Sequence, residues 1–159
     1  MAPRHSHAAV AAPERSRAQE LVTGEAAADR DAMTIVDDKA VLRAVLDPWQ
    51  AAVDAHEPEA VATVFTEDAI FQGLHPYSVG RRGVAEYYAS QPLGMTAMYT
   101  IRETRRLAPD LVLGYLTVDF SFVDRPTLTV YLSVIARHVD GTWLIDHYQV
   151  SRLDFGPGR

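Results

Sequence analysis

Two histidines are the residues best suited to do chemistry in this sequence. His147 lies in the last predicted strand, two residues before Gln149, so an unbroken strand puts both side chains on one face. His75 lies in a central loop close to Tyr77. The imidazole pKa is near neutral, so a histidine in a pocket can act as a general acid or base. We therefore predict His147 and His75 as catalytic residues, with Gln149 orienting a ligand.

Hairpin register predicts which face of the sheet these side chains occupy. A two-residue turn at Asp140-Gly141 sets the register of the last hairpin. Counting back along an unbroken ladder pairs Val134 with His147, and the next pair on that face is Leu132 with Gln149. The rest of this face is apolar and consists of Tyr99, Ile101, Leu116, Val118, Phe120, Val130, Trp143 and Ile145. Polar side chains on an apolar wall are typical of a ligand pocket.

Further ligand contacts are predicted from large or apolar side chains near the same pocket. They are Trp49, Phe71, Tyr77, Tyr99, Leu132 and Val134. For Trp49 the better description is a core tryptophan, and of the adjacent Tyr87 and Tyr88 at most one can point inward. Two alternatives stay open: His147 packs with one backbone hydrogen bond, and His75 is an exposed loop residue.

The sequence lacks the motifs that bind common cofactors. It contains no phosphate-binding loop and no dinucleotide fingerprint. The histidines of the predicted domain do not have metal-ligand spacing, and cysteine is absent. We therefore expect no metal and no cofactor, and any catalysis is predicted to be proton transfer or hydration in an apolar pocket.

The pattern of apolar residues predicts three helices and then a sheet. Helices are predicted over 38–56, 57–66 and 84–91, a short strand over 69–71, and long strands over 95–107, 111–123, 127–139 and 143–153. Asp37 or Asp38 caps the first helix, and Pro48 kinks or breaks it because proline lacks an amide hydrogen. This order predicts an α+β fold in which a curved, mainly antiparallel sheet wraps around the helices.

Composition limits the class of protein. The 159 residues carry a net charge of −6, which argues against a nucleic-acid partner because phosphate binding needs a basic surface. No apolar stretch approaches the roughly 20 residues of a membrane-spanning helix, so no membrane partner is expected. Residues 1–32 contain no Ile, Phe, Trp or Tyr and are predicted to be a disordered tail, so the folded domain is expected over 33–159. The lack of cysteine is compatible with the reducing cytoplasm, where we expect the protein to act.

Three stretches resemble the SnoaL-like branch of the nuclear-transport-factor-two-like (NTF2-like) superfamily. They are AVATVFTEDAIFQGLHP, GRRGVAEYYASQP and DGTWLIDHYQVS. Within them, GLHP, YYASQP and HYQVS are most similar to the SgcJ/EcaC-type proteins of polyketide and enediyne biosynthetic clusters. The resemblance covers nearly all of 34–154. It implies a cone-shaped α+β barrel of the cystatin-like type, usually dimeric, with a pocket between the helices and the sheet.

The catalytic pattern of ketosteroid isomerase, a member of that superfamily, does not fit this sequence. The position of its general base is occupied here by Gln72-Gly73, that of its helix tyrosine by Trp49, and that of its second oxyanion donor falls near Val134. Two functions stay open. One is a cofactor-free isomerase, cyclase or hydratase acting on a hydrophobic polyketide- or enediyne-derived intermediate, and the other is a binding or carrier protein that shields such a molecule. The outer sheet face, which carries Tyr115 and Tyr131, is predicted to form a homodimer.

Overall fold

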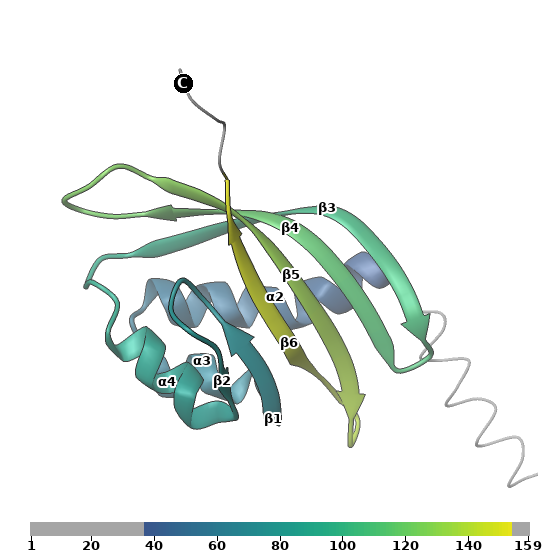
Figure 1. Cartoon of the computed structure of the whole chain (residues 1–159). Helices are drawn as coiled ribbons and strands as arrows, with labels where there is room; N and C mark the ends of the chain where they lie inside the picture. Colours follow the sequence, from purple (N-terminus) through teal and green to yellow (C-terminus); the bar gives the residue numbers. More distant parts are fainter. Residues whose placement is uncertain (1–36, 154–159) are drawn as a thin grey trace, which may run out of the picture. The chain divides into compact units, whose positions relative to one another are not determined.

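The computed structural model describes residues 37–153, and the tail predicted over 1–32 lies outside the described residues. The helices are α2 (Asp38–Asp54), α3 (Pro58–Thr63) and α4 (Arg81–Ala89). The strands are β1 (Phe65–Gln72), β2 (Ser78–Val79), β3 (Thr96–Ala108), β4 (Leu111–Ser121), β5 (Leu128–Val139) and β6 (Thr142–Arg152). Figure 1 shows the four long strands β3 to β6 side by side, as the sequence predicts.

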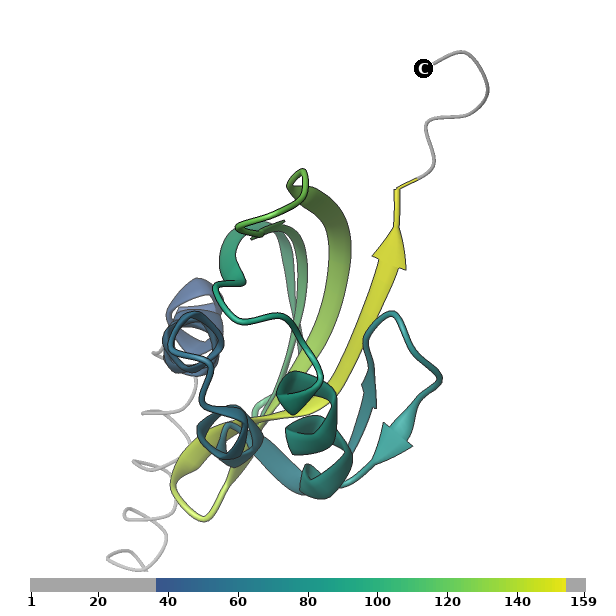
Figure 2. The same cartoon turned by 90° about the vertical axis from the view of Figure 1, so that its left-hand side faces the viewer.

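The strands form one curved sheet with the order β2-β1-β6-β5-β4-β3. β1 runs parallel to β6, and all other neighbouring strands are antiparallel. Figure 2 shows the three helices on the concave side of the sheet, where the core lies. β2 and β3 form the two free edges, so the sheet is open. The predicted α+β fold, with helices packed in a curved and mainly antiparallel sheet, is confirmed.

A β-bulge in β6 changes the predicted register of the last hairpin. The Asp140-Gly141 turn is as predicted, and the pairing agrees with the prediction as far as Ala136 and Ile145. Asp146 is then an extra residue, because the next pair is Ile135 with His147. Side chains after the bulge therefore lie on the face opposite to the predicted one.

Pairing between β4 and β5 is shifted by two residues from the predicted register. Val118 lies opposite Val130, whereas the sequence predicted Leu132 as its partner. Side chains alternate with a period of two, so an even shift leaves each one on its original face. The apolar inner face of these strands is therefore as predicted.

Several elements differ from the sequence prediction, and two of the differences have a clear physical cause. α2 continues through Pro48 without a break. The amide that proline lacks would have bonded the Ala44 carbonyl, and both residues are exposed, so water can bond that carbonyl instead. The first strand begins at Phe65, earlier than predicted, because parallel pairing of Phe65 with Ile145 of β6 buries the phenyl ring completely.

Side chains of α2 occupy the free edge of β3. Asp54 accepts a hydrogen bond from the Ala97 amide over 2.8 Å, and Gln50 accepts one from the Tyr99 amide over 3.3 Å. Asp47 accepts a further hydrogen bond from the Tyr99 hydroxyl. The three acceptors are spaced three and four residues apart and so share one helix face. These hydrogen bonds hold α2 against the edge strand β3.

Candidate functional site

The interior holds three side chains joined by hydrogen bonds, which we call the hydroxyl cluster. Nε1 of Trp49 donates to the Tyr88 hydroxyl over 3.1 Å, and the hydroxyl oxygens of Tyr88 and Tyr148 lie 3.0 Å apart. The exposed fractions of the three residues are 0%, 4% and 1%. They come from α2, α4 and β6, so the cluster forms only when the helices pack against the sheet.

Local structure directs each member of the hydroxyl cluster inward. Trp49 lies on the buried stripe of α2, and Tyr88 lies on that of α4. Tyr148 follows the Asp146 bulge, which returns the chain to the inner face three residues after Ile145. Without the extra residue, ordinary strand alternation would direct Tyr148 away from the helices.

Aromatic rings surround the hydroxyl cluster. Phe71 stacks on Tyr148 with ring centroids 4.7 Å apart, and Phe65 meets the same ring at 5.8 Å. Phe120 packs its edge against Trp49 with centroids 6.3 Å apart. In such apolar surroundings, hydrogen bonds are strengthened, and a polar atom without a partner is costly in free energy.

The hydroxyl cluster has one more donor hydrogen than its hydrogen bonds use. Trp49, Tyr88 and Tyr148 supply three donor hydrogens, and among the described residues these make two hydrogen bonds. Tyr88 either donates to Tyr148 or accepts from it, so the free hydrogen is on one hydroxyl or the other. In both cases one O–H of the pair makes no hydrogen bond within the cluster.

Burial raises the pKa of Tyr88 and of Tyr148 above the ordinary tyrosine value of 10.0. The cause is that a phenolate loses its hydration in an apolar interior. The hydrogen bonds that Tyr88 makes to Tyr148 and Trp49 partly oppose this effect on the Tyr88 pKa. Repulsion from an ionised Tyr88 adds to the effect of burial on the Tyr148 pKa. Both hydroxyls therefore stay protonated at neutral pH and act as neutral donors.

A small apolar cavity adjoins the hydroxyl cluster. Its volume is about 30 Å³, which is room for about one or two water molecules. Its wall contains Tyr88 and consists otherwise of Leu74, Tyr87, Gln91, Met95, Phe120, Phe122, Leu128 and Val150. Among the described residues, this lining includes no histidine and no carboxylate. Several lining side chains are partly exposed, so the cavity lies close to the surface on that side.

Other parts of the described structure are weaker candidates for a site. A hollow of about 580 Å³ between α3 and α4 lies on the outer surface beside exposed charges, such as the paired Arg82 and Glu86. Within residues 37–153, no three acidic or histidine side chains come close enough together to hold a metal ion. No helix in that range has the length and apolar character needed to cross a bilayer.

Comparison with known proteins identifies the fold. No family model and no curated protein matches this chain. A solved domain of unknown function with a cystatin-like fold, from Nostoc punctiforme, matches with a TM-score of 0.65 and 18% identity over 74% of this chain and 79% of that one. An NTF-2 like protein of unknown function from Shewanella oneidensis matches with a TM-score of 0.62 and 16% identity over 71% of this chain and 98% of that one. The chain has an NTF2-like fold.

A ketosteroid isomerase-like protein from Erwinia carotovora atroseptica shares this NTF2-like fold. It matches with a TM-score of 0.63 and 21% identity over 72% of this chain and 95% of that one. Identities this low establish the fold and leave the activity open. Similarity to the SgcJ/EcaC-type proteins in particular stays a prediction from the sequence.

The prediction that His147 and Gln149 lie on the concave face of this fold is wrong. The bulge at Asp146 turns both side chains outward, where His147 pairs with Ile135 and Gln149 is exposed. Tyr148 takes the inward position instead. Neither residue lines the interior cavity. A catalytic role for His147 stays a prediction, without an interior pocket beside it.

Three further predicted site residues lie outside the cavity lining. His75 is exposed, and its ring lies 5.3 Å from that of Tyr87, which does line the cavity. Tyr77 is 65% exposed. Tyr99 directs its hydroxyl to Asp47 on α2. Ligand contact by Tyr77 or Tyr99 therefore has no support from their positions, whereas His75 lies near the edge of the cavity.

The remaining predicted ligand contacts lie in the interior. They are Trp49, Phe71, Leu132 and Val134, and all four are buried. Trp49 is the member of this group that makes a hydrogen bond in the hydroxyl cluster. Phe71 contributes its ring face to Tyr148.

Sequence reasoning missed the two tyrosines that form the hydroxyl pair. It allowed one of Tyr87 and Tyr88 to point inward, and Tyr88 does so, while Tyr87 accepts a hydrogen bond from the Leu74 amide over 3.2 Å. Tyr148 was missed because the strand was assumed to alternate without interruption. The apolar residues Ile145 and Tyr148 are three positions apart, and this odd step was the available signal of a bulge.

Proposed function

We propose that this protein binds a small, largely apolar molecule between its helices and its sheet. The observation that carries the proposal is that Tyr88, one of the two tyrosines that share the free O–H, lines an apolar cavity. A molecule in the cavity that places a carbonyl or similar oxygen against Tyr88 would accept the Tyr88 hydrogen, and the Tyr148 hydroxyl would then donate to Tyr88. The described lining offers no charged side chain to balance an ionised group. The favoured ligand is therefore neutral and carries a hydrogen-bond acceptor.

Entry of such a ligand requires the cavity to enlarge. Pockets for drug-sized molecules occupy about 300–1,000 Å³, far more than the roughly 30 Å³ found here. Leu74, Gln91, Phe122 and Leu128 line the cavity and are partly exposed, so their side chains can rotate toward solvent. Opening on this side would bring a ligand to Tyr88 without unfolding the core.

Proton transfer is the second candidate function. A carbonyl that accepts a hydrogen bond from a buried tyrosine becomes polarised, which lowers the free energy of removing a proton beside it. His75 is the described histidine near the cavity, with its ring 5.3 Å from Tyr87. In this alternative, His75 takes the proton. We favour binding because the cavity lining itself holds no base.

A polyketide- or enediyne-derived intermediate is the ligand that we propose. This part of the proposal is supported by the resemblance of GLHP, YYASQP and HYQVS to proteins of such clusters. Polyketide intermediates are rich in carbonyl groups and largely apolar, which suits the free O–H and the apolar lining. We accordingly place the protein in cytoplasmic secondary metabolism. Mass spectrometry of metabolites that bind to it, or are changed by it, in extracts of a strain lacking the protein tests this assignment.

We also propose that the protein forms a homodimer through the outer sheet face. Partly exposed apolar side chains cross this face, and Tyr115 and Tyr131 stack there with ring centroids 5.3 Å apart. A face of this kind suits a self-complementary interface of roughly 800 Å² per partner. Sedimentation should show a dimer for the wild type and a monomer for Tyr131→Asp. A monomeric wild type at high micromolar concentration would refute the dimer.

A matched pair of probes tests the proposed binding site. Acetophenone and α-methylstyrene have nearly the same shape, because a CH₂ group replaces the carbonyl oxygen, and only acetophenone carries an acceptor. We expect both to perturb the amide resonances around Tyr88, which lines the cavity, and acetophenone to bind about 2- to 10-fold more tightly, as one net hydrogen bond gives. The Phe122→Ala variant, which widens the cavity beside a partly exposed residue, should bind both more tightly.

The outcomes separate the parts of the proposal. Absence of binding of either probe, in the wild type and in Phe122→Ala, would refute an interior ligand site. Equal affinity for the two probes would keep the site but refute the role of the free O–H. The double variant Tyr88→Phe/Tyr148→Phe is the control, and it should bind the two probes with more nearly equal affinity.

A further inference from the structure

The position of Tyr148 depends on where β6 gains its extra residue. The inward-facing residues of β6 are Trp143, Ile145, Tyr148 and Val150, so the spacing changes from two to three after Ile145. Asp146 occupies the bulge on the β5 side. The pairing of β6 with β1 is irregular at the same place, because Phe65 lies opposite Ile145 but Ile70 lies opposite His147. The ladders on both sides of β6 are therefore irregular at Asp146.

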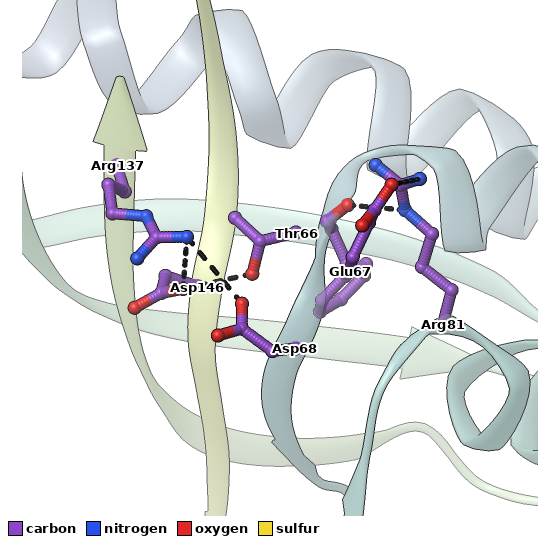
Figure 3. A network of polar contacts seen from close by, with 7 residues as sticks. Thr66, Glu67, Asp68, Arg81, Arg137 and Asp146 are labelled. Carbon is purple, nitrogen blue, oxygen red and sulfur yellow. Dashed lines mark hydrogen bonds and ion pairs between the residues drawn. The ribbon is translucent and has the colours of Figure 1, made fainter. Parts of the chain in front are cut away.

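The side chain of Asp146 is held by residues on both neighbouring strands (Figure 3). The Thr66 hydroxyl of β1 donates to Oδ1 of Asp146 over 2.9 Å. Nη2 of Arg137 on β5 lies 3.5 Å from the same oxygen and 3.5 Å from Oδ1 of Asp68 on β1. Thr66 is only 2% exposed, so its hydroxyl depends on this carboxylate for a partner.

We propose that Asp146 is a positioning residue, whose carboxylate fixes the bulge and so directs the Tyr148 hydroxyl to Tyr88. Burial of Tyr148 and Val150 favours an odd step somewhere in β6, and the contacts to Thr66 and Arg137 place that step at Asp146. Loss of the carboxylate leaves Thr66 without its acceptor and removes one of the two carboxylates that face Arg137. The strand then loses the interactions that distinguish this register from an unbulged one. The effect on ligand binding rests on the function proposed above.

Single cysteines report directly on the face that each β6 residue occupies. The natural chain contains no cysteine, so each introduced thiol is the only one. In the wild-type background, Gln149→Cys is exposed and should react rapidly with a maleimide, whereas Val150→Cys, at a position only 7% exposed, should react slowly. The rate ratio is the Gln149→Cys rate divided by the Val150→Cys rate. In the Asp146→Ala background we expect this ratio to fall at least tenfold. General destabilisation would raise both rates, whereas a register change slows one and speeds the other.

Two variants serve as controls for this experiment. Asp146→Asn keeps an oxygen that can accept the Thr66 hydroxyl, so most of the rate ratio should be retained. Asp119 also accepts a threonine hydrogen bond, from Thr129 over 2.6 Å, but lies in a regular part of the ladder. Asp119→Ala should therefore leave the ratio unchanged.

The proposal is overturned if folded Asp146→Ala keeps the wild-type rate ratio. If Asp146→Ala does not fold, Thr66→Val decides the question, because it removes the donor and leaves the carboxylate; an unchanged ratio in that variant also overturns the proposal. Acetophenone binding is measured on the same proteins. A fall in the ratio in a protein that never binds acetophenone supports the positioning role and refutes the ligand site, so the two failures can be told apart.

Discussion

Replacing the two buried tyrosines by phenylalanine should give a distinctive order of stabilities. Tyr88→Phe removes both hydrogen bonds of the hydroxyl cluster and leaves the Trp49 N–H and the Tyr148 O–H without partners. The wild type has one unpartnered donor hydrogen and this variant has two. One further buried donor without a partner costs about 1–3 kcal/mol, so the free energy of unfolding should fall by that amount.

Tyr148→Phe should be much milder, although it also removes a buried hydroxyl. The substitution removes one donor together with one hydrogen bond, so one unpartnered hydrogen, that of Tyr88, remains as in the wild type. We expect a loss below about 1 kcal/mol. The double variant leaves only the Trp49 N–H without a partner. It should therefore be no less stable than Tyr88→Phe alone, so the second substitution compensates for part of the first.

Urea unfolding followed by circular dichroism measures these differences. The midpoint urea concentration should shift, while the slope of the unfolding free energy against urea concentration stays the same. If Tyr148→Phe lowers the free energy of unfolding as much as Tyr88→Phe does, the count of donor hydrogens is refuted. A double variant whose loss equals the sum of the two single losses would refute it as well, because independent hydroxyls add and a shared hydrogen-bond chain does not.

Three further predictions concern the packing, the pH dependence and the tail. Gly114→Ala should destabilise by about 1–3 kcal/mol in urea unfolding, because its new methyl group would lie 2.7 Å from Leu42 Cδ1, and Leu42→Val should relieve part of that loss. The raised pKa values of Tyr88 and Tyr148 mean that the unfolded chain loses these protons first above pH 10, so the contribution of these two groups to stability is constant below pH 10 and falls above it. Above pH 10 the free energy of unfolding should fall by up to about 1.4 kcal/mol per pH unit for each hydroxyl. The double variant Tyr88→Phe/Tyr148→Phe should lack this part of the fall in alkaline titrations. Removal of 1–32 should leave the melting temperature of the domain unchanged, because this segment has no Ile, Phe, Trp or Tyr to bury.

The sequence carried enough information to predict the elements and the apolar inner face of the sheet. Alternating apolar residues mark the long strands, and the Asp140-Gly141 turn places both its residues at positive φ, 49° and 83°, as a tight hairpin requires. Parallel pairing between β1 and β6 was not predictable in the same way. It joins segments at opposite ends of the domain, and no local turn determines their register.

The candidate site shows how a single irregular residue limits prediction. Every residue before Asp146 that was predicted on the inner face packs in or against the core, including Trp143 and Ile145. One extra residue reversed the assignment of His147 and brought Tyr148 inward. A bulge of this kind depends on partners on other strands, such as Thr66, which a count along one strand does not include.

The contact between α2 and β3 also has a consequence for the behaviour of the protein in concentrated solution. An edge strand with open amide groups can recruit a strand of another molecule and begin an aggregate. Here Gln50 and Asp54 already accept two of those amide hydrogens, from Tyr99 and Ala97. The helix that supplies Trp49 to the interior therefore also blocks pairing with neighbouring molecules at this part of the β3 edge. Substitutions on this face of α2 that leave the core unchanged would then lower solubility before they lower stability.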